Sequence, residues 1–256
     1  MKVTPAPSTE TATDGLVRLN RFLSQAGVCS RRAADELIAG GRVAINGTVD
    51  RELGRKVDPL RDEVFVDGER VQTERPVYLL FNKPKGVVCT NAHQEKHARV
   101  IDLLPPMRGR VYTVGRLDLD AEGLILVTND GQFAQAMTHP RYGVPKTYAA
   151  LLRGRIDEDA LAKARGGVWL AEGRTDKAKI VRERLGRDRS YLKITVRESR
   201  HRELRRVFAK LGFPVLELKR VRIGPLSLHR LSRGGSRFLS AAEVRGLLDA
   251  AGQEDS

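Results

Sequence analysis

The sequence predicts an α+β protein made of a small N-terminal α+β domain and a larger domain with a mainly antiparallel β-sheet flanked by helices. Two observations support this prediction. Residues 16–72 read as two short amphipathic helices followed by short strands joined by tight turns. Residues 77–249 alternate between strand-like runs and helical segments with no repeat of fixed period, which favours an antiparallel sheet backed by helices. The polar residues 73–76 are the expected linker.

The two ends of the chain carry no apolar periodicity. We expect residues 1–15 to form a disordered leader and residues 250–256 a disordered tail. The leader has no apolar core of a signal peptide, and no run is long enough to span a bilayer. Cys29 and Cys89 lie far apart and outside any C-x-x-C pair, which argues against a disulfide framework. We therefore expect a cytoplasmic protein with no membrane partner.

The charge balance indicates a polyanionic partner. Lys and Arg number 46 against 32 Asp and Glu, a formal net charge of +14 at pH 7. Such an excess favours nucleic acid, and arginine suits phosphates and base edges because its planar guanidinium donates in pairs. A basic protein with no role in nucleic-acid binding is the alternative.

The first domain follows from local signals. The stretch RLNRFLSQAGV places Leu19, Phe22 and Leu23 on one helical face, and Gly27 can end that helix in a left-handed turn. Ser30 is a suitable N-cap for the helix RRAADELIAGG. The pairs Asn46-Gly47 and Asp67-Gly68 each predict a tight turn between two short strands.

Five arginines cluster around these two helices: Arg18, Arg21, Arg31, Arg32 and Arg42. A helix N-terminus attracts anions, so phosphate binding is one interpretation, and a solvated basic face is the other. The order of helix, glycine turn, Ser-Arg-Arg, helix, Gly-Gly, Arg-Val and Asn-Gly resembles the alpha-L RNA-binding module, named after the fourth protein of the small ribosomal subunit.

The second domain has a longer series of elements. VYLLFN, GVVCT, RVYTVGRL, LILVT, KTYAALL, AKIVRERL, SYLKITV and VLELKRVRIG read as strands. Helices are expected at GQFAQAMTH, with Asn129 or Asp130 as cap, at residues 157–165, at RHRELRRVFAKLG, and at the C-terminal SAAEVRGLLDAAG starting at Ser240.

Motifs for metals, cofactors and thiol chemistry are missing from the sequence. His93 and His97 are four residues apart, but the glutamate is in the wrong position for H-E-x-x-H, and the polar segment reads as a surface loop. There is no G-x-x-x-x-G-K-[ST], no G-x-G-x-x-G and no G-x-S-x-G. We expect chemistry without a metal and without a cofactor.

Asp118 is the candidate for that chemistry. It lies between Leu117 and Leu119 in a stretch that otherwise reads as buried strand, and a buried carboxylate needs a partner, a proton or a chemical role. An ionised aspartate can attack carbon and form a covalent intermediate, and a nearby guanidinium would orient it. The alternative is a structural ion pair with Arg116. The basic segment that could supply the guanidinium contains Arg200, Arg202, Arg205 and Arg206.

Four stretches resemble, in this order, the sequence blocks of the ribosomal RNA pseudouridine synthases: NKPKGVVCT, GRLDLDAEGLILVTNDG, PKTYAALL and ESRHRELRRVFAKLGFPVLELKRVRIGPLSL. The resemblance covers roughly residues 16–240 and is to the branch with an alpha-L module. It implies an isomerase that detaches uracil from ribose at N1, turns the base and rejoins it through C5 without a cofactor. The implied partner is ribosomal RNA or a ribosomal-subunit assembly intermediate.

The resemblance also implies roles for single residues. Asp118 is in the position of the nucleophile, Tyr148 matches the active-site tyrosine, and Arg205 matches the basic residue that pairs with the aspartate. Leu204 matches an aliphatic residue near the base, and Arg116 could fill the gap left by a flipped nucleotide. We expect RNA contacts from Arg116, Leu204, Arg18, Arg21, Arg31, Arg32, Arg42, Lys83, Arg202 and Arg206.

The chain departs from the family's last block at two positions. Ser199 replaces a glycine and Glu203 replaces a glutamine, and Glu203 adds negative charge beside the site. The sequence of the other blocks favours a large-subunit (23S) rRNA substrate. We also expect a monomer. A small-subunit rRNA synthase and a non-catalytic RNA-binding assembly factor remain alternatives. A DNA-binding regulator is disfavoured because neither domain shows a groove-reading helix of a dimer.

Overall fold

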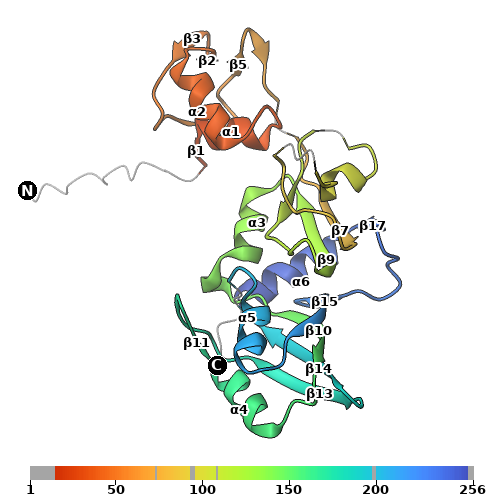
Figure 1. Cartoon of the computed structure of the whole chain (residues 1–256). Coiled ribbons are helices and arrows are strands. Elements are labelled where there is room, and N and C mark those ends of the chain that lie inside the picture. Colours follow the sequence, from red (N-terminus) through yellow and green to blue (C-terminus); the bar gives the residue numbers. More distant parts are fainter. Residues whose placement is uncertain (1–14, 73, 93–95, 108, 198–199, 253–256) are drawn as a thin grey trace, which may run out of the picture. The chain divides into compact units, whose positions relative to one another are not determined.

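The structure, a computed structural model, describes residues 15–72, 74–92, 96–107, 109–197 and 200–252 (Figure 1). The described residues fall into two units, an N-terminal unit within residues 1–75 and 108–110, and a C-terminal unit within residues 76–107 and 111–256. The predicted leader up to residue 14, the tail from residue 253, His93 and Ser199 lie outside the described residues. Among the described residues, no helix combines the length and the apolar character needed to cross a membrane.

The N-terminal unit has two helices packed on short strands. Its elements are β1 (Val17–Arg18), α1 (Leu19–Gln25), α2 (Arg31–Ala39), β2 (Val43–Ile45), β3 (Thr48–Asp50), β4 (Lys56–Val57), β5 (Val64–Val66) and β6 (Glu69–Arg70). The predicted cap and turn are confirmed: Ser30 Oγ accepts a hydrogen bond from the backbone N–H of Ala33 at 3.2 Å, and Gly27 has φ +78°. The buried apolar residues of the two helices, among them Leu19 and Ile38, form the core with β2, β4 and β5. The pairing of β1 with β4 was not predicted, because each strand has only two residues.

The C-terminal unit is a mixed α+β domain around one large sheet. Its strands are β7 (Tyr78–Lys83), β8 (Tyr112–Val114), β9 (Glu122–Thr128), β10 (Lys146–Arg153), β13 (Lys179–Leu185), β14 (Arg189–Val196), β15 (Val215–Ile223), β16 (Leu226–Ser227) and β17 (Ser236–Phe238). The order along the sheet is β13-β14-β10-β15-β9-β7-β17, with β8 on β9 and β16 on β15.

The sheet is antiparallel except at one junction. β15 and β9 run parallel and pair through only two sets of residues, Lys219 with Glu122 and Arg220 with Gly123. By contrast, all eight residues of β10 pair with β14. This junction divides the sheet into one half made of β13, β14, β10 and β15 and another made of β9, β8, β7 and β17.

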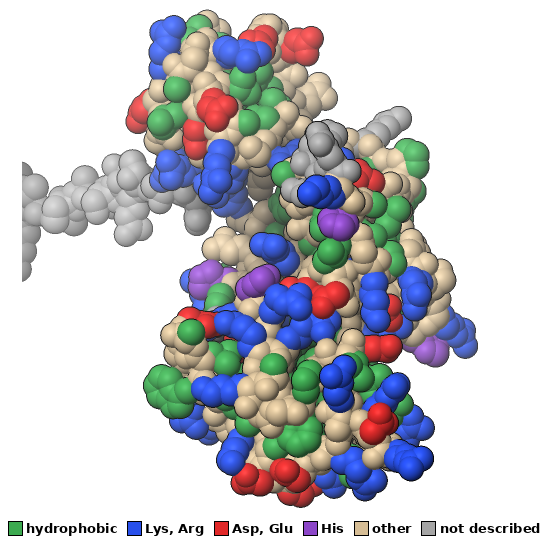
Figure 2. Space-filling model, in the orientation of Figure 1, with side chains coloured by type: hydrophobic (Ala, Val, Ile, Leu, Met, Phe, Trp, Pro, Cys, Tyr) green, Lys and Arg blue, Asp and Glu red, His purple; other side chains and the backbone are tan. Residues whose placement is uncertain are grey.

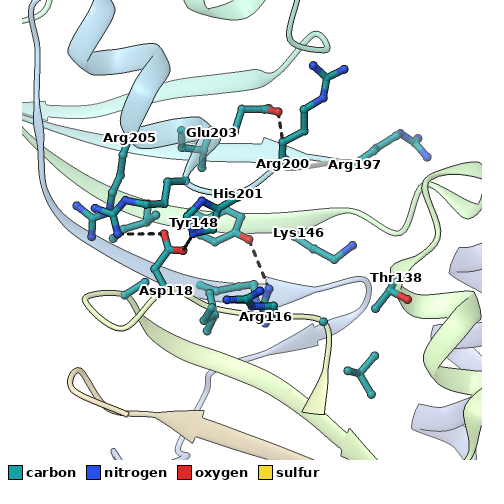
Figure 3. Close-up of a pocket in the computed structure, with 18 of the residues that line it drawn as sticks. Arg116, Asp118, Thr138, Lys146, Tyr148, Arg197, Arg200, His201, Glu203 and Arg205 are labelled. Atoms are coloured by element: carbon teal, nitrogen blue, oxygen red, sulfur yellow. Dashed lines mark hydrogen bonds and ion pairs between the residues drawn. The ribbon is translucent and has the colours of Figure 1, made fainter. Parts of the chain in front are cut away.

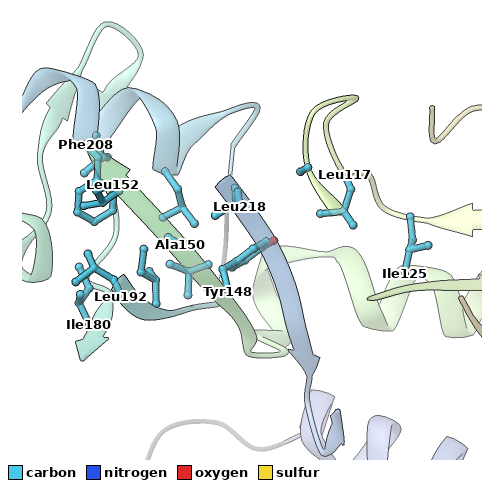
Figure 4. Packing of buried hydrophobic residues seen from close by; sticks show 14 of the residues in the cluster. Leu117, Ile125, Tyr148, Ala150, Leu152, Ile180, Leu192, Phe208 and Leu218 are labelled. Atoms are coloured by element: carbon cyan, nitrogen blue, oxygen red, sulfur yellow. The ribbon is translucent and has the colours of Figure 1, made fainter. Parts of the chain in front are cut away.

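Helices cover the sheet on both faces. One core cluster packs α4 (Glu158–Gly166) and α5 (Glu203–Lys210) on one face, and Figure 4 shows Phe208, Leu152 and Ile180 within it. A second cluster packs α3 (Gly131–Thr138) and α6 (Ala241–Gly252) on the other face. The alternation of β9 explains the two layers, because Ile125 belongs to the first cluster and Leu126 to the second.

The helix cap predicted in this unit is confirmed. Asp130 caps α3 by accepting from the N–H groups of Gln132 and Phe133. The structure differs from the predictions at three places. Residues 250–252 belong to α6, as the helix expected from Ser240 implied, and not to the expected tail. Residues 86–90 form no strand, only an isolated bridge from Val88 to Arg99. The hairpin of β11 (Trp169–Leu170) and β12 (Gly173–Arg174) lies where no strand was expected.

Candidate active site

A cavity of about 410 Å³ opens in the C-terminal unit where the two halves of the sheet meet (Figure 3). Its lining includes residues 114–118 and Ala121 before β9, Thr138 and Pro140 at the end of α3, and Lys146 and Tyr148 of β10. Arg197 after β14 and residues 200–205, in the basic segment, complete one side. β15 contributes Leu218 and Arg220. The volume is within the range of small-molecule pockets, roughly 300–1,000 Å³.

Asp118 lies on the loop between β8 and β9 and lines this cavity. Its side chain is 18% exposed. Its Oδ1 is 3.8 Å from His201 Nε2, and its Oδ2 is 3.8 Å from Arg202 Nη1. Figure 3 shows His201 next to the carboxylate of Asp118. The aspartate therefore faces the basic segment, and the alternative of a structural pair with Arg116 is not what the structure shows.

Arg205 has a different partner from the one the resemblance implies. Its Nη2 is 3.1 Å from Asp120 Oδ2, and its Nη1 donates to the carbonyl of Val215 at 3.0 Å. Asp120 also accepts two hydrogen bonds from Arg202, at 3.0 and 3.2 Å. Burial alone would raise the pKa of Asp120, but the hydrogen bonds from Arg202 and the charge of Arg205 lower it. The expected pair of Arg205 with Asp118 is thus corrected to a pair with Asp120, which ties the Asp118 loop to α5.

Tyr148 lies at the floor of the cavity with only 5% of its surface exposed. Its hydroxyl is 3.5 Å from Arg220 Nη1, the residue directly across the β10–β15 pair. Arg220 is 3% exposed, and its Nε donates to the carbonyl of Leu124 at 2.6 Å. Within the described part of the chain, Arg220 Nη2 is buried without a hydrogen-bond partner. The floor of the cavity therefore holds the phenol of Tyr148 beside the guanidinium of Arg220, whose Nη2 can still donate a hydrogen bond.

The prediction that Lys83 contacts RNA is wrong. The side chain is fully buried, and its Nζ donates to the carbonyls of Ala121 at 2.7 Å and Pro84 at 2.9 Å. Burial lowers the pKa of Lys83, while the nearby Cys89, Asp118 and Asp120 oppose that shift. Lys83 thus holds the loop that carries Asp118 and cannot reach a phosphate.

The other predicted RNA contacts lie in two places. Arg116, Leu204 and Arg202 line the cavity, and Arg202 precedes α5 in a left-handed conformation with φ +52°. Arg206 faces the β11–β12 hairpin and forms an ion pair with Glu172. In the N-terminal unit Arg18, Arg31, Arg32 and Arg42 are exposed and Arg21 is half-buried. Figure 2 shows Lys and Arg side chains spread over the visible face of each unit.

One of these arginines already has an anionic partner. Arg42 Nε donates to Asp67 Oδ1 at 2.8 Å, and its Nη2 pairs with the second oxygen. Hydrogen bonding to Arg42 lowers the pKa of Asp67. A phosphate at Arg42 would compete with this carboxylate, so Arg31 and Arg32 at the start of α2 are the better placed of the predicted phosphate contacts.

Lys146, His201 and Arg220 line the cavity and were not predicted from the sequence. Lys146 lies two residues before Tyr148 on the same strand, so the period of two places it on the same face and could have revealed it. Burial, and then the charge of Arg220, lower the pKa of Lys146 to about 8. Arg220 could not be found from sequence, because its place depends on the pairing of β10 with β15. Among the described residues, no group of three or more His, Cys, Asp or Glu side chains is arranged to hold a metal ion.

Comparison with known proteins gives a consistent result. Residues 77–210 match the family described as RNA pseudouridylate synthase, and residues 17–59 match the S4 domain. An uncharacterized RNA pseudouridine synthase of Aquifex aeolicus is 41% identical over 239 residues, 92% of this chain and 95% of that protein. The ribosomal large subunit pseudouridine synthase B of Bacillus subtilis is 40% identical over 232 residues, 90% of this chain and 95% of that protein. A crystal structure of a pseudouridylate synthase superposes with a TM-score of 0.65 at 30% identity, covering 90% of this chain and 99% of that one.

Proposed function

Because the chain belongs to the RNA pseudouridine synthase family and carries an N-terminal S4 domain, we propose that it isomerises one uridine of large-subunit ribosomal RNA, with Asp118 as the nucleophile. One observation supports the proposal above others: Asp118, Tyr148, Arg202 and Arg205 line one cavity. A protein that only binds RNA has no need for a carboxylate at that place, because a carboxylate repels phosphate.

The reaction exchanges one bond of the target nucleotide for another. The bond between N1 and C1′ breaks with its electron pair on the uracil, the base turns, and C5 bonds to C1′. A proton leaves C5 and N1 gains one, so the product is an isomer and no oxidant or reductant is needed. Asp118 attacks carbon and holds the nucleotide covalently while the base turns. The bond from Asp118 to that carbon breaks before the product leaves, and its electron pair returns to the carboxylate. Asp118 lies between His201 and Arg202, which orient the carboxylate.

Tyr148 is proposed to contact the base and to take part in the proton transfer. Its ring borders the cavity and its hydroxyl is held by Arg220. Arg116, at the cavity edge, is proposed to occupy the place that the flipped nucleotide leaves in the RNA. Arg205, through Asp120, keeps the catalytic loop against α5, so it acts as a positioning residue.

The S4 domain is proposed to bind the RNA around the target through phosphates and shape. Arg31 and Arg32 are exposed at the first turn of α2. Each phosphate contact adds about 0.9 to the slope of log K against log salt concentration for duplex. We expect the double variant Arg31→Gln, Arg32→Gln to lower that slope by about 1 to 2 and to leave the turnover of bound RNA unchanged. The whole enzyme is proposed to act as a cytoplasmic monomer, which light scattering of the protein with and without RNA would test.

The function is tested with purified protein and transcripts of large- and small-subunit rRNA. Pseudouridine is mapped by sequence position, and RNA affinity is measured by filter binding. We expect the wild type to modify one uridine of the large-subunit transcript, and Asp118→Asn to bind RNA with wild-type affinity and form no product. Asp159→Asn, which changes an exposed carboxylate on α4, is the matched control and should keep full activity.

Three outcomes would contradict parts of the proposal. Product from Asp118→Asn at the wild-type rate would show that Asp118 is not the nucleophile. Product only on the small-subunit transcript would change the substrate but keep the chemistry. If the wild type binds RNA and forms no product, the alternative function, an RNA-binding assembly factor, is favoured.

A further inference from the structure

The hairpin of β11 and β12 holds a large aromatic side chain in solvent. Trp169 is 66% exposed and is the only tryptophan of the chain. Single exposed apolar side chains are common on protein surfaces, so the ring alone indicates little. Its surroundings decide the interpretation.

The hairpin is fixed in place, so the exposure of the ring is not a result of a loose loop. Lys210 Nζ donates to the carbonyl of Trp169 at 2.6 Å, and Arg206 pairs with Glu172. Thr175 exchanges two hydrogen bonds with Val168, one through its hydroxyl at 3.0 Å. Val168 is a buried member of the main core. The backbone is thus anchored on both sides while the indole remains outside.

The same contacts place the hairpin at the rim of the active-site cavity. Arg200 lines the cavity, and its Nη1 donates to the carbonyl of Glu172 at 3.1 Å. α5 carries Leu204 and Arg205 into the cavity, and from the same helix Arg206 and Lys210 hold the hairpin. Figure 1 shows β11 next to α5. RNA whose uridine enters the cavity must therefore pass close to this hairpin.

The charge around the ring suits a nucleic acid. Arg174 is the direct cross-strand partner of Trp169, and Arg200, Arg206 and Lys210 contact the hairpin. The hairpin segment itself carries two carboxylates, Glu172 and Asp176, so cations are in excess around the ring. An exposed aromatic ring among guanidinium groups is the arrangement with which proteins bind single-stranded nucleic acid: the ring stacks on a base and the cations hold the phosphates.

We propose that Trp169 stacks on an unpaired base of the RNA strand that carries the target uridine, at a nucleotide outside the cavity. The proposal rests on RNA being the substrate, as proposed above. The stacked base compensates for part of the unstacking that accompanies flipping of the uridine. The site takes any base, because every base has a flat face.

The sole tryptophan makes the test direct. The full chain is titrated with a single-stranded oligouridylate of eight nucleotides and with an RNA duplex of equal charge, while indole emission and its quenching by acrylamide are followed. We expect the single strand to quench the emission and to shield the ring from acrylamide, and the duplex to do so much less. This readout needs no turnover, so it is independent of whether pseudouridine forms.

Variants provide the second arm. Trp169→Ala should weaken binding of the single strand by about 5- to 100-fold, and Trp169→Phe, which keeps a ring, by much less. Phe238→Ala is the matched control, because this ring is 61% exposed on β17, the last strand at the opposite edge of the sheet from β13. Thermal unfolding of each variant confirms that it is folded. Unchanged emission and acrylamide quenching on RNA saturation, or equal affinity of Trp169→Ala and wild type, would overturn the proposal.

Discussion

Replacing Lys146 by methionine should stabilise the protein at neutral pH and weaken its function. Lys146 is half-buried at the cavity, and its Nζ has a backbone partner, the carbonyl of Val144 at 3.1 Å. Burial, and then the charge of Arg220, lower its pKa from 10.5 to about 8. The folded protein therefore holds this charge at the expense of stability, which is common for groups kept for binding or catalysis.

The size of the effect follows from the shift. A change from 10.5 to about 8 corresponds to ~3 kcal/mol, at about 1.4 kcal/mol per pKa unit. Because Lys146 is partly exposed, solvent screening reduces that figure, and the lost hydrogen bond to Val144 removes about 1 kcal/mol more. We expect Lys146→Met to raise the free energy of unfolding by about 1–2 kcal/mol at pH 7.

The sign of the pH dependence is fixed by proton binding. Between pH 8 and 10.5 the unfolded chain keeps the proton of Lys146 while the folded chain has lost it, so the contribution of Lys146 to stability rises with pH. The gain of Lys146→Met over wild type is therefore largest below pH 8 and disappears near pH 10.5. Other titrating groups, such as Lys83 and Cys89, are common to both proteins and cancel in the difference.

The assay is denaturant unfolding of both proteins at a series of pH values from 7 to 10, followed by the emission of Trp169, which reports on the C-terminal unit. RNA affinity is measured in parallel and should fall, since a cation at the cavity is lost. A difference in stability that stays constant over this pH range, or a variant less stable than wild type at pH 7, would refute the reasoning.

Three further substitutions test the packing, the electrostatics and the backbone of the C-terminal unit. Phe208→Ala should lower the free energy of unfolding by about 3–5 kcal/mol in denaturant titrations, because the ring is fully buried. The pKa of Glu243 is lowered to about 2, mainly by a hydrogen bond from Arg237. The wild type should therefore be more stable than Glu243→Gln by about 1–2 kcal/mol at neutral pH. In acid unfolding curves this advantage should vanish as the pH falls from about 4.5 to 2. Gly123→Ala should destabilise the protein strongly and abolish product formation, because at φ +108° its Cβ would lie 2.2 Å from the carbonyl oxygen of Arg220.

Matched substitutions control for the general effect of each change. Phe238→Ala removes an exposed ring and should shift the unfolding midpoint little. Gly47→Ala keeps a positive φ of +83° but meets no atom within 4 Å, so it should cost only about 1–2 kcal/mol of backbone strain. If Phe238→Ala destabilises the protein as much as Phe208→Ala, burial of the ring is not the cause. If Gly47→Ala destabilises it as much as Gly123→Ala, the steric clash is not the cause.

The sequence predicted those parts of the fold that depend on neighbours along the chain. The caps at Ser30 and Asp130 were found because each side chain bonds backbone groups two or three residues ahead. The strand of residues 86–90 was wrong because apolar runs also occur in irregular segments that border a core, as Val87 does. The β11–β12 hairpin was missed because strands of two residues have no period to detect.

The site was predicted less completely than the fold. The apolar neighbours of Asp118 singled it out, and family resemblance added Tyr148, thirty residues later. The structure places both at one cavity, while their chemical roles stay predictions. Which cation meets which carboxylate could not be predicted, because Arg202 and Arg205 are both close enough to Asp120 and only the turn of α5 decides. Lys83 was expected to contact RNA, but it ends β7 and its Nζ donates to the carbonyl of Ala121, a contact that only the folded chain reveals.

The short parallel junction between β9 and β15 has a consequence for how such enzymes can diverge. One half of the sheet brings the acid and the other brings the phenol and the arginines, and among the described residues only two residue pairs join β9 to β15. Changes in one half are limited by the residues that contact the other half, at Gly123 and Arg220, at Asp120 and α5, and in the shared core. In a chimaera, one half of the sheet comes from a relative. Such a chimaera should fold but stay inactive, unless the residues on both sides of the junction between the halves come from the same protein.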